Sequence, residues 1–235
     1  MNLKQAKVLL TGGSLGIGKA TAKMLVDAGA KVVITGRNED RLKEAAEETG
    51  AQYVVADVSQ PEEVKHTYQQ TTQLMGGLDV LINNAGIGGG FSPLSEVTAD
   101  DFLSVYSVNV MGVAMMSQLA AEIFKKQGHG SIINIGSTAG TKGFERGTVY
   151  ASSKFALRGM TQCWQAELRK HNIRVMLINP SEVTTAFGNK DREERDEEAN
   201  KLRSREIAHA ITSALQMDDR GFIPELAVWA TNPWK

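Results

Sequence analysis

Residues 7 to 18 read Lys7-Val-Leu-Leu-Thr11-Gly-Gly-Ser14-Leu-Gly16-Ile-Gly18. The apolar start favours a short buried strand, and a helical pattern follows from Lys19 to Ala28. Glycine permits positive φ angles and close approach of the backbone, and the start of a helix presents free N–H groups to anions. A strand, a glycine-rich turn and a helix in this order therefore predict a phosphate cradle of a dinucleotide-binding fold. The alternative, a tight turn without a ligand, does not account for the two flanking elements.

Apolar, β-leaning runs alternate with helical patterns along the rest of the chain. Strands are expected at 7–11, 31–35, 52–55, 78–82, 131–135, 173–178 and, as a short seventh, 221–223. Helices are expected at 19–28, 39–49, 61–74, 98–126 with a break near Ser104, 150–171 and 204–216. The pattern predicts an α/β fold, a single-domain Rossmann-type doubly wound parallel sheet of six to seven strands flanked by helices on both faces. We expect one domain over 1–235, with a dinucleotide-binding half at about 1–110 and a catalytic and substrate-loop half at about 111–235.

Composition narrows the class of protein. The 235 residues are 42% hydrophobic, which is enough for one full core, and the net charge of −1 gives no strong attraction to nucleic acid or anionic membranes. Cys163 is the only cysteine, so no intrachain disulfide can form, as is usual in a reducing compartment. We see no signal-peptide pattern and no run near the ~18 apolar residues of a membrane span. We expect a cytoplasmic protein with no metal site and no nucleic-acid or membrane partner.

Tyr150 and Lys154 lie four residues apart, which places them on one face of a helix, and Ser137 lies thirteen residues upstream. A positive charge about 4 Å away, at an effective dielectric near 20, is worth roughly 4 kcal/mol, which lowers a phenol pKa by about three. We therefore expect Lys154 to bring the pKa of Tyr150 toward the range useful for acid–base catalysis. The Ser137 hydroxyl is placed to hold a carbonyl or alcohol oxygen.

Five elements together resemble the classical short-chain dehydrogenases/reductases, namely Thr11 to Gly18, Asn83-Asn84-Ala85-Gly86, Asn109, Ser137 and Tyr150-x-x-x-Lys154. These elements occur in the family's order and cover nearly the whole chain. Within the family, the chain resembles 3-oxoacyl-carrier-protein reductase-like members. The resemblance implies an oxidoreductase that transfers hydride between a nicotinamide and a carbonyl or alcohol, with 3-oxoacyl thioesters as one substrate class. Two alternatives stay open: a reductase of another small or apolar ketone or aldehyde, steroid-like ones included, and a catalytically silent NADP(H)-binding regulatory protein.

The resemblance also implies roles for single residues. Tyr150 would donate the proton, Lys154 would assist it and hold the nicotinamide ribose, Ser137 would bind the substrate oxygen, and Asn109 would position a proton-relay water. The alternatives are a turn hydroxyl for Ser137 and a buried amide satisfied by the backbone for Asn109. The implied cofactor-binding residues are Gly12, Ser14, Gly16, Ile17, Gly18, Arg37, Asp57, Val58, Asn84, Ala85, Gly86, Tyr150, Lys154, Pro180, Val183 and Thr185.

The choice of cofactor depends on the end of the second strand. Proteins that prefer NAD place a carboxylate there to bind the ribose hydroxyls. This chain has Gly36 followed by Arg37, so the repulsion of a 2′-phosphate is absent and a guanidinium is at hand. We predict NADP(H), with NAD(H) less favoured; the alternative is that Arg37 is a solvated loop charge. A departure from the family is Ser181, which replaces a glycine beside the nicotinamide pocket.

The substrate side is less defined. Candidate pocket residues are Thr138, Phe144, Glu182 and Phe187, with a flexible glycine rim before Phe91. The charged segment 188–200 is interpreted either as a solvated or disordered stretch or as a mobile lid over the site.

Partners are inferred from two expected helices. We expect a small-molecule carbonyl or acyl-thioester substrate, and a homodimer or homotetramer formed through helices 104–126 and 150–171. An acyl-carrier protein is a candidate partner at Lys125-Lys126 and Arg169-Lys170, whose alternative is plain solvated helix ends.

Overall fold

The structure is a computed structural model that describes residues 1–189 and 191–234. Within that part, seven strands form one parallel sheet in the order β3-β2-β1-β4-β5-β6-β7. The strands are β1 Lys7–Thr11, β2 Lys31–Gly36, β3 Gln52–Val55, β4 Val80–Asn83, β5 Gly130–Ile135, β6 Ile173–Pro180 and β7 Glu225–Val228. The α-helices are α1 Gly16–Asp27, α2 Glu39–Thr49, α3 Pro61–Met75, α4 Ala99–Tyr106, α5 Val113–Gln127, α6 Thr148–Leu168 and α7 Ser204–Gln216. The predicted doubly wound α/β fold is confirmed.

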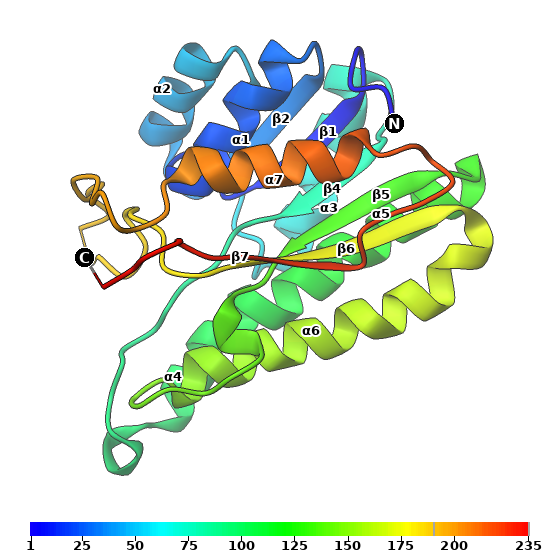
Figure 1. The fold of residues 1–235 in the computed structure, drawn as a ribbon. Helices are drawn as coiled ribbons and strands as arrows, with labels where there is room; N and C mark the ends of the chain where they lie inside the picture. The colour runs from blue at the N-terminus through cyan, green and yellow to red at the C-terminus, as the bar shows by residue number, and fades with distance from the viewer. Residues whose placement is uncertain (190, 235) are drawn as a thin grey trace.

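The strands are continuously apolar because both faces of the sheet are buried. In β1, Val8 and Leu10 point into the core beside α1, α2 and α7, whereas Leu9 points into the core beside α3, α5 and α6. The alternation repeats in β4, where Val80 and Ile82 share the first core and Leu81 the second. Figure 1 shows the same layering, with α1, α2 and α7 above the sheet and α4, α5 and α6 below it.

The strand order reverses between β1 and β4. β1 pairs with β2 on one side and with β4 on the other, so the two halves of the chain run away from this point in opposite directions. In open parallel sheets, the loops at such a point diverge at the carboxyl ends of the strands and leave a crevice for a ligand. The glycine-rich turn after β1 therefore starts at the place where the topology opens the sheet edge.

Two predicted elements are misplaced relative to the structure. The seventh strand is Glu225–Val228 rather than 221–223, because Phe222 and Ile223 pack on the core before the chain reaches β6. The expected break near Ser104 is instead a π-helical turn at Ser107–Gly112, which joins α4 and α5 without interrupting the helix. Such turns often occur at functional sites.

The helical segment Ala99–Gln127 is long and apolar enough to cross a membrane by length and composition, a property that we did not expect from the sequence. The apolar window is 44% buried within the fold. Met116, Ala120 and Phe124 pack into the core beside α3 and α6. The core helices of soluble proteins pass the same test, so the segment is accounted for by its packing.

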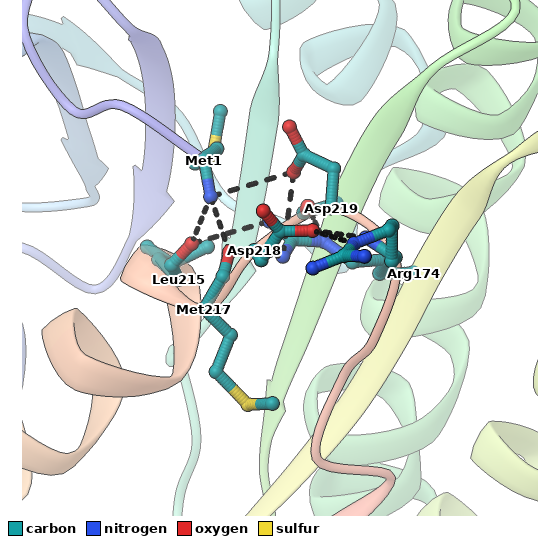
Figure 2. A network of polar contacts seen from close by, with 8 residues as sticks. Met1, Arg174, Leu215, Met217, Asp218 and Asp219 are labelled. Carbon is teal, nitrogen blue, oxygen red and sulfur yellow. Dashed lines mark hydrogen bonds and ion pairs between the residues drawn. The ribbon is translucent and has the colours of Figure 1, made fainter.

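At the amino end of β6, opposite the crevice, a polar network joins the strand to the end of α7 (Figure 2). The amino group of Met1 donates to the carbonyl oxygens of Leu215 at 2.9 Å and Met217 at 2.6 Å. The guanidinium of Arg174, which is 7% exposed, donates to the same two carbonyls at 3.3 Å each. Cations at the carboxyl end of a helix satisfy its free carbonyls and its dipole. The network therefore fixes α7 against β6, away from the crevice.

Candidate active site

A cavity of about 1120 Å³ lies at the carboxyl ends of the strands, where the order reverses. Segments from the whole length of the chain meet there. Residues predicted for the cofactor that line it are Gly12, Ser14, Gly16, Ile17, Arg37, Asp57, Val58, Asn84, Ala85, Gly86, Tyr150, Lys154, Pro180, Val183 and Thr185. Residues predicted for the chemistry or the substrate that line it are Ser137, Thr138, Phe144, Glu182 and Phe187. Gly18 and Asn109 do not line the cavity.

The glycine-rich turn is packed too closely to accept side chains at two positions. A Cβ on Gly18 would lie 2.1 Å from the carbonyl oxygen of Gly12, and a Cβ on Gly12 would lie 2.8 Å from the Cα of Ala85. Gly12 also has a φ of +67°, which glycine adopts without strain. The amide of Asn84 ties the turn to β4 by donating to the carbonyls of Thr11 at 3.0 Å and Gly12 at 2.8 Å. The first residues of α1, Gly16 and Ile17, are thus held at the cavity wall.

The end of β2 carries positive charge on the cavity wall. Arg37 is exposed and pairs loosely with Asp57, with 3.7 Å between Nη1 and Oδ2. Asn38 caps α2 by accepting a hydrogen bond of 2.8 Å from the backbone N–H of Arg41. The cap begins the helix directly after Arg37, and it places Arg41 on the same wall of the cavity.

Tyr150 and Lys154 lie one turn apart on α6, and Ser137 faces them from the end of β5. The Nζ of Lys154 lies 5.8 Å from the centre of the Tyr150 ring and donates a hydrogen bond of 2.9 Å to the carbonyl oxygen of Ile135. Lys154 is 7% exposed, whereas the Tyr150 ring is half-buried at the cavity wall. The structure thus brings three of the four predicted catalytic side chains, Ser137, Tyr150 and Lys154, to one place on the cavity wall.

The electrostatics differ from the expectation that Lys154 lowers the pKa of Tyr150. Burial raises the pKa of Tyr150, and hydrogen bonding to the Ser137 side chain opposes that rise only in part. Burial also lowers the pKa of Lys154 to about 8, because the ammonium loses its hydration. Our estimate assumed a charge about 4 Å from the phenol and neglected burial. In the structure, burial determines the direction for both groups, and Tyr150 is a neutral phenol at pH 7.

Asn109 sits in the π-helical turn, 1% exposed, and its amide is satisfied by protein atoms. Its Oδ1 accepts from the N–H of Ile87 at 2.9 Å, and its Nδ2 donates to the carbonyl of Ile87 at 2.9 Å and to the Ser153 hydroxyl at 3.1 Å. These contacts match the alternative that we gave for Asn109, a buried amide satisfied by the backbone. The amide thereby joins the loop after β4 to α6.

The comparisons with known proteins agree with this geometry. Residues 6–196 match the family model described as short chain dehydrogenase. The chain belongs to the short-chain dehydrogenase family. An uncharacterized oxidoreductase of Staphylococcus aureus is 33% identical over 227 residues, which cover 94% of this chain and 95% of that protein.

Two solved structures of the family superpose closely. An alcohol dehydrogenase from the archaeon Thermococcus sibiricus, complexed with 5-hydroxy-NADP, has a TM-score of 0.86 at 29% identity, covering 96% of this chain and 97% of that one. A 3-ketoacyl-(acyl-carrier-protein) reductase from Brucella melitensis, complexed with NADH, has a TM-score of 0.89 at 27% identity, covering 98% and 99%.

The cavity wall around Tyr150 in this short-chain dehydrogenase is aromatic. Tyr150 contacts the rings of Phe91 and Phe187, with centroid distances of 6.1 and 5.6 Å, and Phe91 lies 5.8 Å from Phe144. Glu182 does not present a free carboxylate here, because it pairs with Lys201 at 2.5 Å and with Arg195 at 4.0 Å. The negative charge of Glu182 is therefore neutralised by two cations beside the cavity.

The departure at Ser181 is accommodated in the backbone. Its N–H donates a hydrogen bond of 2.8 Å to the carbonyl of Val228, which continues the pairing of β6 with β7. Pro180, Val183 and Thr185 remain on the cavity wall around it. A side chain at position 181 thus leaves the matching positions in place.

Segment 191–195, which we call the strap, enters the site although we predicted no residue in it. Its Glu194 accepts hydrogen bonds from the N–H of Gly16 at 2.7 Å and of Ala186 at 3.1 Å. Arg195 donates to the carbonyls of Thr185 at 3.2 Å and Val183 at 3.1 Å. These contacts place residues 191–195 of the predicted segment 188–200 against the cavity, while residue 190 lies outside the described residues; a mobile lid stays a prediction. The alternating charges of the strap were visible in the sequence, but their partners are distant along the chain.

Among residues 1–189 and 191–234, no group of three or more His, Cys, Asp or Glu side chains is arranged to hold a metal ion. The polar groups on the described cavity wall include hydroxyls, an amine and guanidinium groups.

Proposed function

We propose that this protein is an NADP(H)-dependent oxidoreductase that interconverts a carbonyl compound and its alcohol. The observation that carries the proposal is that Ser137, Tyr150 and Lys154 line the same cavity as the glycine-rich turn and Arg37. A dinucleotide lying along this cavity, from Arg37 past the glycine-rich turn to Tyr150, would pass all the residues predicted for it except Gly18, which does not line the cavity.

The residues present fit such a cofactor. The glycine turn leaves no room for side chains and presents N–H groups, which suits a pyrophosphate. The ammonium of Lys154 supplies a donor beside Tyr150, and Pro180, Val183 and Thr185 border the nicotinamide end. A bound nicotinamide supplies the two-electron redox chemistry that the side chains of this chain cannot supply themselves.

The side chains then handle the proton and the substrate oxygen. Tyr150 is protonated at neutral pH, because burial raises its pKa, so its O–H can donate to the carbonyl oxygen of a substrate. Ser137 donates a hydrogen bond to the same oxygen and stabilises the negative charge that develops on it. The ammonium of Lys154, 5.8 Å from the centre of the Tyr150 ring, favours the phenolate that forms, while burial keeps the resting phenol neutral.

The preference for NADP(H) rests on the end of β2. Gly36 offers no carboxylate to a ribose, and the guanidinium of Arg37 stands on the cavity wall. An arginine fork binds a phosphate bidentately, and the loose pair with Asp57 leaves it free to turn.

The aromatic walls favour a substrate with an apolar substituent beside its carbonyl. Phe91, Phe144 and Phe187 surround the Tyr150 ring on the substrate side. A 3-oxoacyl thioester remains a second candidate, since a solved structure similar to this chain is a 3-ketoacyl-(acyl-carrier-protein) reductase. An acyl-carrier protein at the ends of α5 and α6 stays a candidate partner, since the exposed pair of Lys125 with Glu167 at 2.9 Å is worth only about 1 kcal/mol or less.

We also infer a cytoplasmic homodimer or homotetramer. Leu103, Met111 and Phe155 are 68%, 56% and 45% exposed along α4, the π-helical turn and α6, an apolar surface that a second copy would cover. Light scattering after size exclusion measures the mass directly. A monomer at micromolar concentration contradicts this inference.

The function is tested with a panel of aromatic ketones, aliphatic ketones, aldehydes, steroids and 3-oxoacyl thioesters, each with NADPH and NADH in parallel. Turnover with NADPH on at least one apolar carbonyl is expected, together with loss of turnover but retained NADPH binding in Tyr150→Phe. If the parent binds NADPH and turns over no compound, the protein is a cofactor-binding regulator instead.

A further inference from the structure

Three guanidinium groups converge at the β2 end of the cavity, although they come from segments far apart in the sequence. Arg37 follows β2, Arg41 lies in the first turn of α2, and Arg192 belongs to the strap. All three line the cavity. The strap is held at this end because the Nη2 of Arg41 donates a hydrogen bond of 3.1 Å to the carbonyl oxygen of Asp191.

The arrangement is unfavourable for the three cations by themselves. Burial lowers the pKa of the half-buried Arg192, and the charges of Arg37 and Arg41 lower it further. Among the described residues, Arg37 has Asp57 at 3.7 Å, but no carboxylate oxygen lies within 4.0 Å of Arg41 or Arg192. Arg192 also has a φ of +55°, which costs a residue with a Cβ roughly 1–2 kcal/mol. Repelling, partly buried cations in a strained backbone are stabilised by an anion that they share.

The chemistry of the three groups identifies that anion as a phosphate. Guanidinium forks match phosphate oxygens bidentately, and a phosphate monoester carries close to two negative charges at pH 7. If the protein binds NADP(H) as proposed above, this end of the cavity holds the adenosine part of the cofactor. We propose that Arg192 is a specificity-determining residue that completes a 2′-phosphate site with Arg37 and Arg41, brought to it by the strap. This rests on the proposed preference for NADP(H).

Binding by the full chain tests this without relying on turnover. The probes are 2′,5′-ADP against 5′-AMP by calorimetry, and NADPH against NADH by fluorescence, at one fixed ionic strength. Arg192→Ala is expected to weaken 2′,5′-ADP and NADPH about tenfold, since a charge-assisted hydrogen bond is worth about that factor, and to leave 5′-AMP and NADH unchanged. Arg192→Lys should keep part of the affinity. The matched control is Arg220→Gln, which removes the same charge from a 92% exposed side chain that bonds only within its own turn.

The outcomes separate this proposal from the cofactor preference on which it rests. If the parent prefers 2′,5′-ADP, Arg37→Ala abolishes that preference, and Arg192→Ala does not change it, the role of Arg192 is overturned while the cofactor proposal stands. Equal losses for 2′,5′-ADP and 5′-AMP in Arg192→Ala also overturn it, because Arg192 would then act through the fold. A parent that binds both probes equally overturns the NADP(H) preference itself, and the role of Arg192 with it.

Discussion

The ammonium nitrogen of Lys154 lies 5.8 Å from the centre of the Tyr150 ring, and the lysine is almost fully removed from solvent. The loss of hydration dominates its electrostatics, so its pKa falls from 10.5 to about 8. The same burial raises the pKa of Tyr150. The pair therefore keeps a neutral phenol beside an ammonium that is close to losing its proton.

Lys154→Met is expected to stabilise the fold at pH 7, by an amount that shrinks as the pH rises. Between about pH 8 and 10.5 the unfolded chain binds more protons at this position than the folded protein, so the parent gains stability with pH across that window. The advantage of the variant should be about 2 kcal/mol smaller at pH 9.5 than at pH 7. Urea unfolding at the two pH values measures it. An advantage that does not change with pH contradicts the lowered pKa.

Ser137→Ala is expected to lower kcat/KM for carbonyl reduction by about 10²–10³-fold, the usual effect of losing one donor to a developing oxyanion. The hydroxyl also lowers the pKa of Tyr150, so its removal should move the alkaline limb of the pH profile upward. Ser152→Ala is the matched control, since that hydroxyl bonds to Val149 within α6 and does not line the cavity. Binding of NADPH should be unchanged in both variants, and weakened binding in Ser137→Ala contradicts a role at the substrate oxygen.

Gly18→Ala is expected to disrupt the cofactor turn. The new Cβ would lie 2.1 Å from the Gly12 carbonyl and 2.6 Å from the Asn84 amide nitrogen, so the turn must shift. We expect a lower Tm and at least tenfold weaker NADPH binding. Gly159→Ala is the control, because a Cβ at that position of α6 has nothing within 4 Å and should stabilise the helix by up to about 1 kcal/mol. Equal behaviour of the two variants would contradict the close packing of the turn.

Glu194→Gln is expected to tighten NADPH binding about three- to tenfold. Its carboxylate accepts a hydrogen bond from the N–H of Gly16 at 2.7 Å, a donor that a cofactor phosphate would have to take from it. Glu193→Gln removes the same charge next to it without a side-chain contact to the turn. Fluorescence titration gives the affinities, and hydrogen exchange at the Gly16 amide reports the local contact. Equal gains in both variants would indicate general charge repulsion in place of competition.

Sequence patterns predicted correctly those structural features that depend on interactions between neighbouring residues. The strand at 7–11 carries the apolar run Val8-Leu9-Leu10 at its buried centre, and the four-residue spacing of Tyr150 and Lys154 puts both on one helix face whatever surrounds them. The seventh strand was misplaced because Phe222 and Ile223 are apolar for packing, and apolar runs of three residues do not distinguish a strand from a packed loop. The π-helical turn at Ser107–Gly112 also escaped prediction, because its composition is that of an ordinary helix.

The chain's order of residues by itself determined the alternating strands and helices, the glycine turn, the Tyr150–Lys154 pair and Arg37 at the end of β2. Each of these follows from hydrophobic periodicity or from chemistry within a few residues. Only the tertiary structure decided that burial, and not the neighbouring charge, shifts the pKa values of Tyr150 and Lys154. It also decided that Glu194 meets Gly16 and that Arg192 joins Arg37 and Arg41 at one wall. Desolvation and long-range contacts depend on which distant segments pack together, and the spacing of residues along the chain does not contain that information.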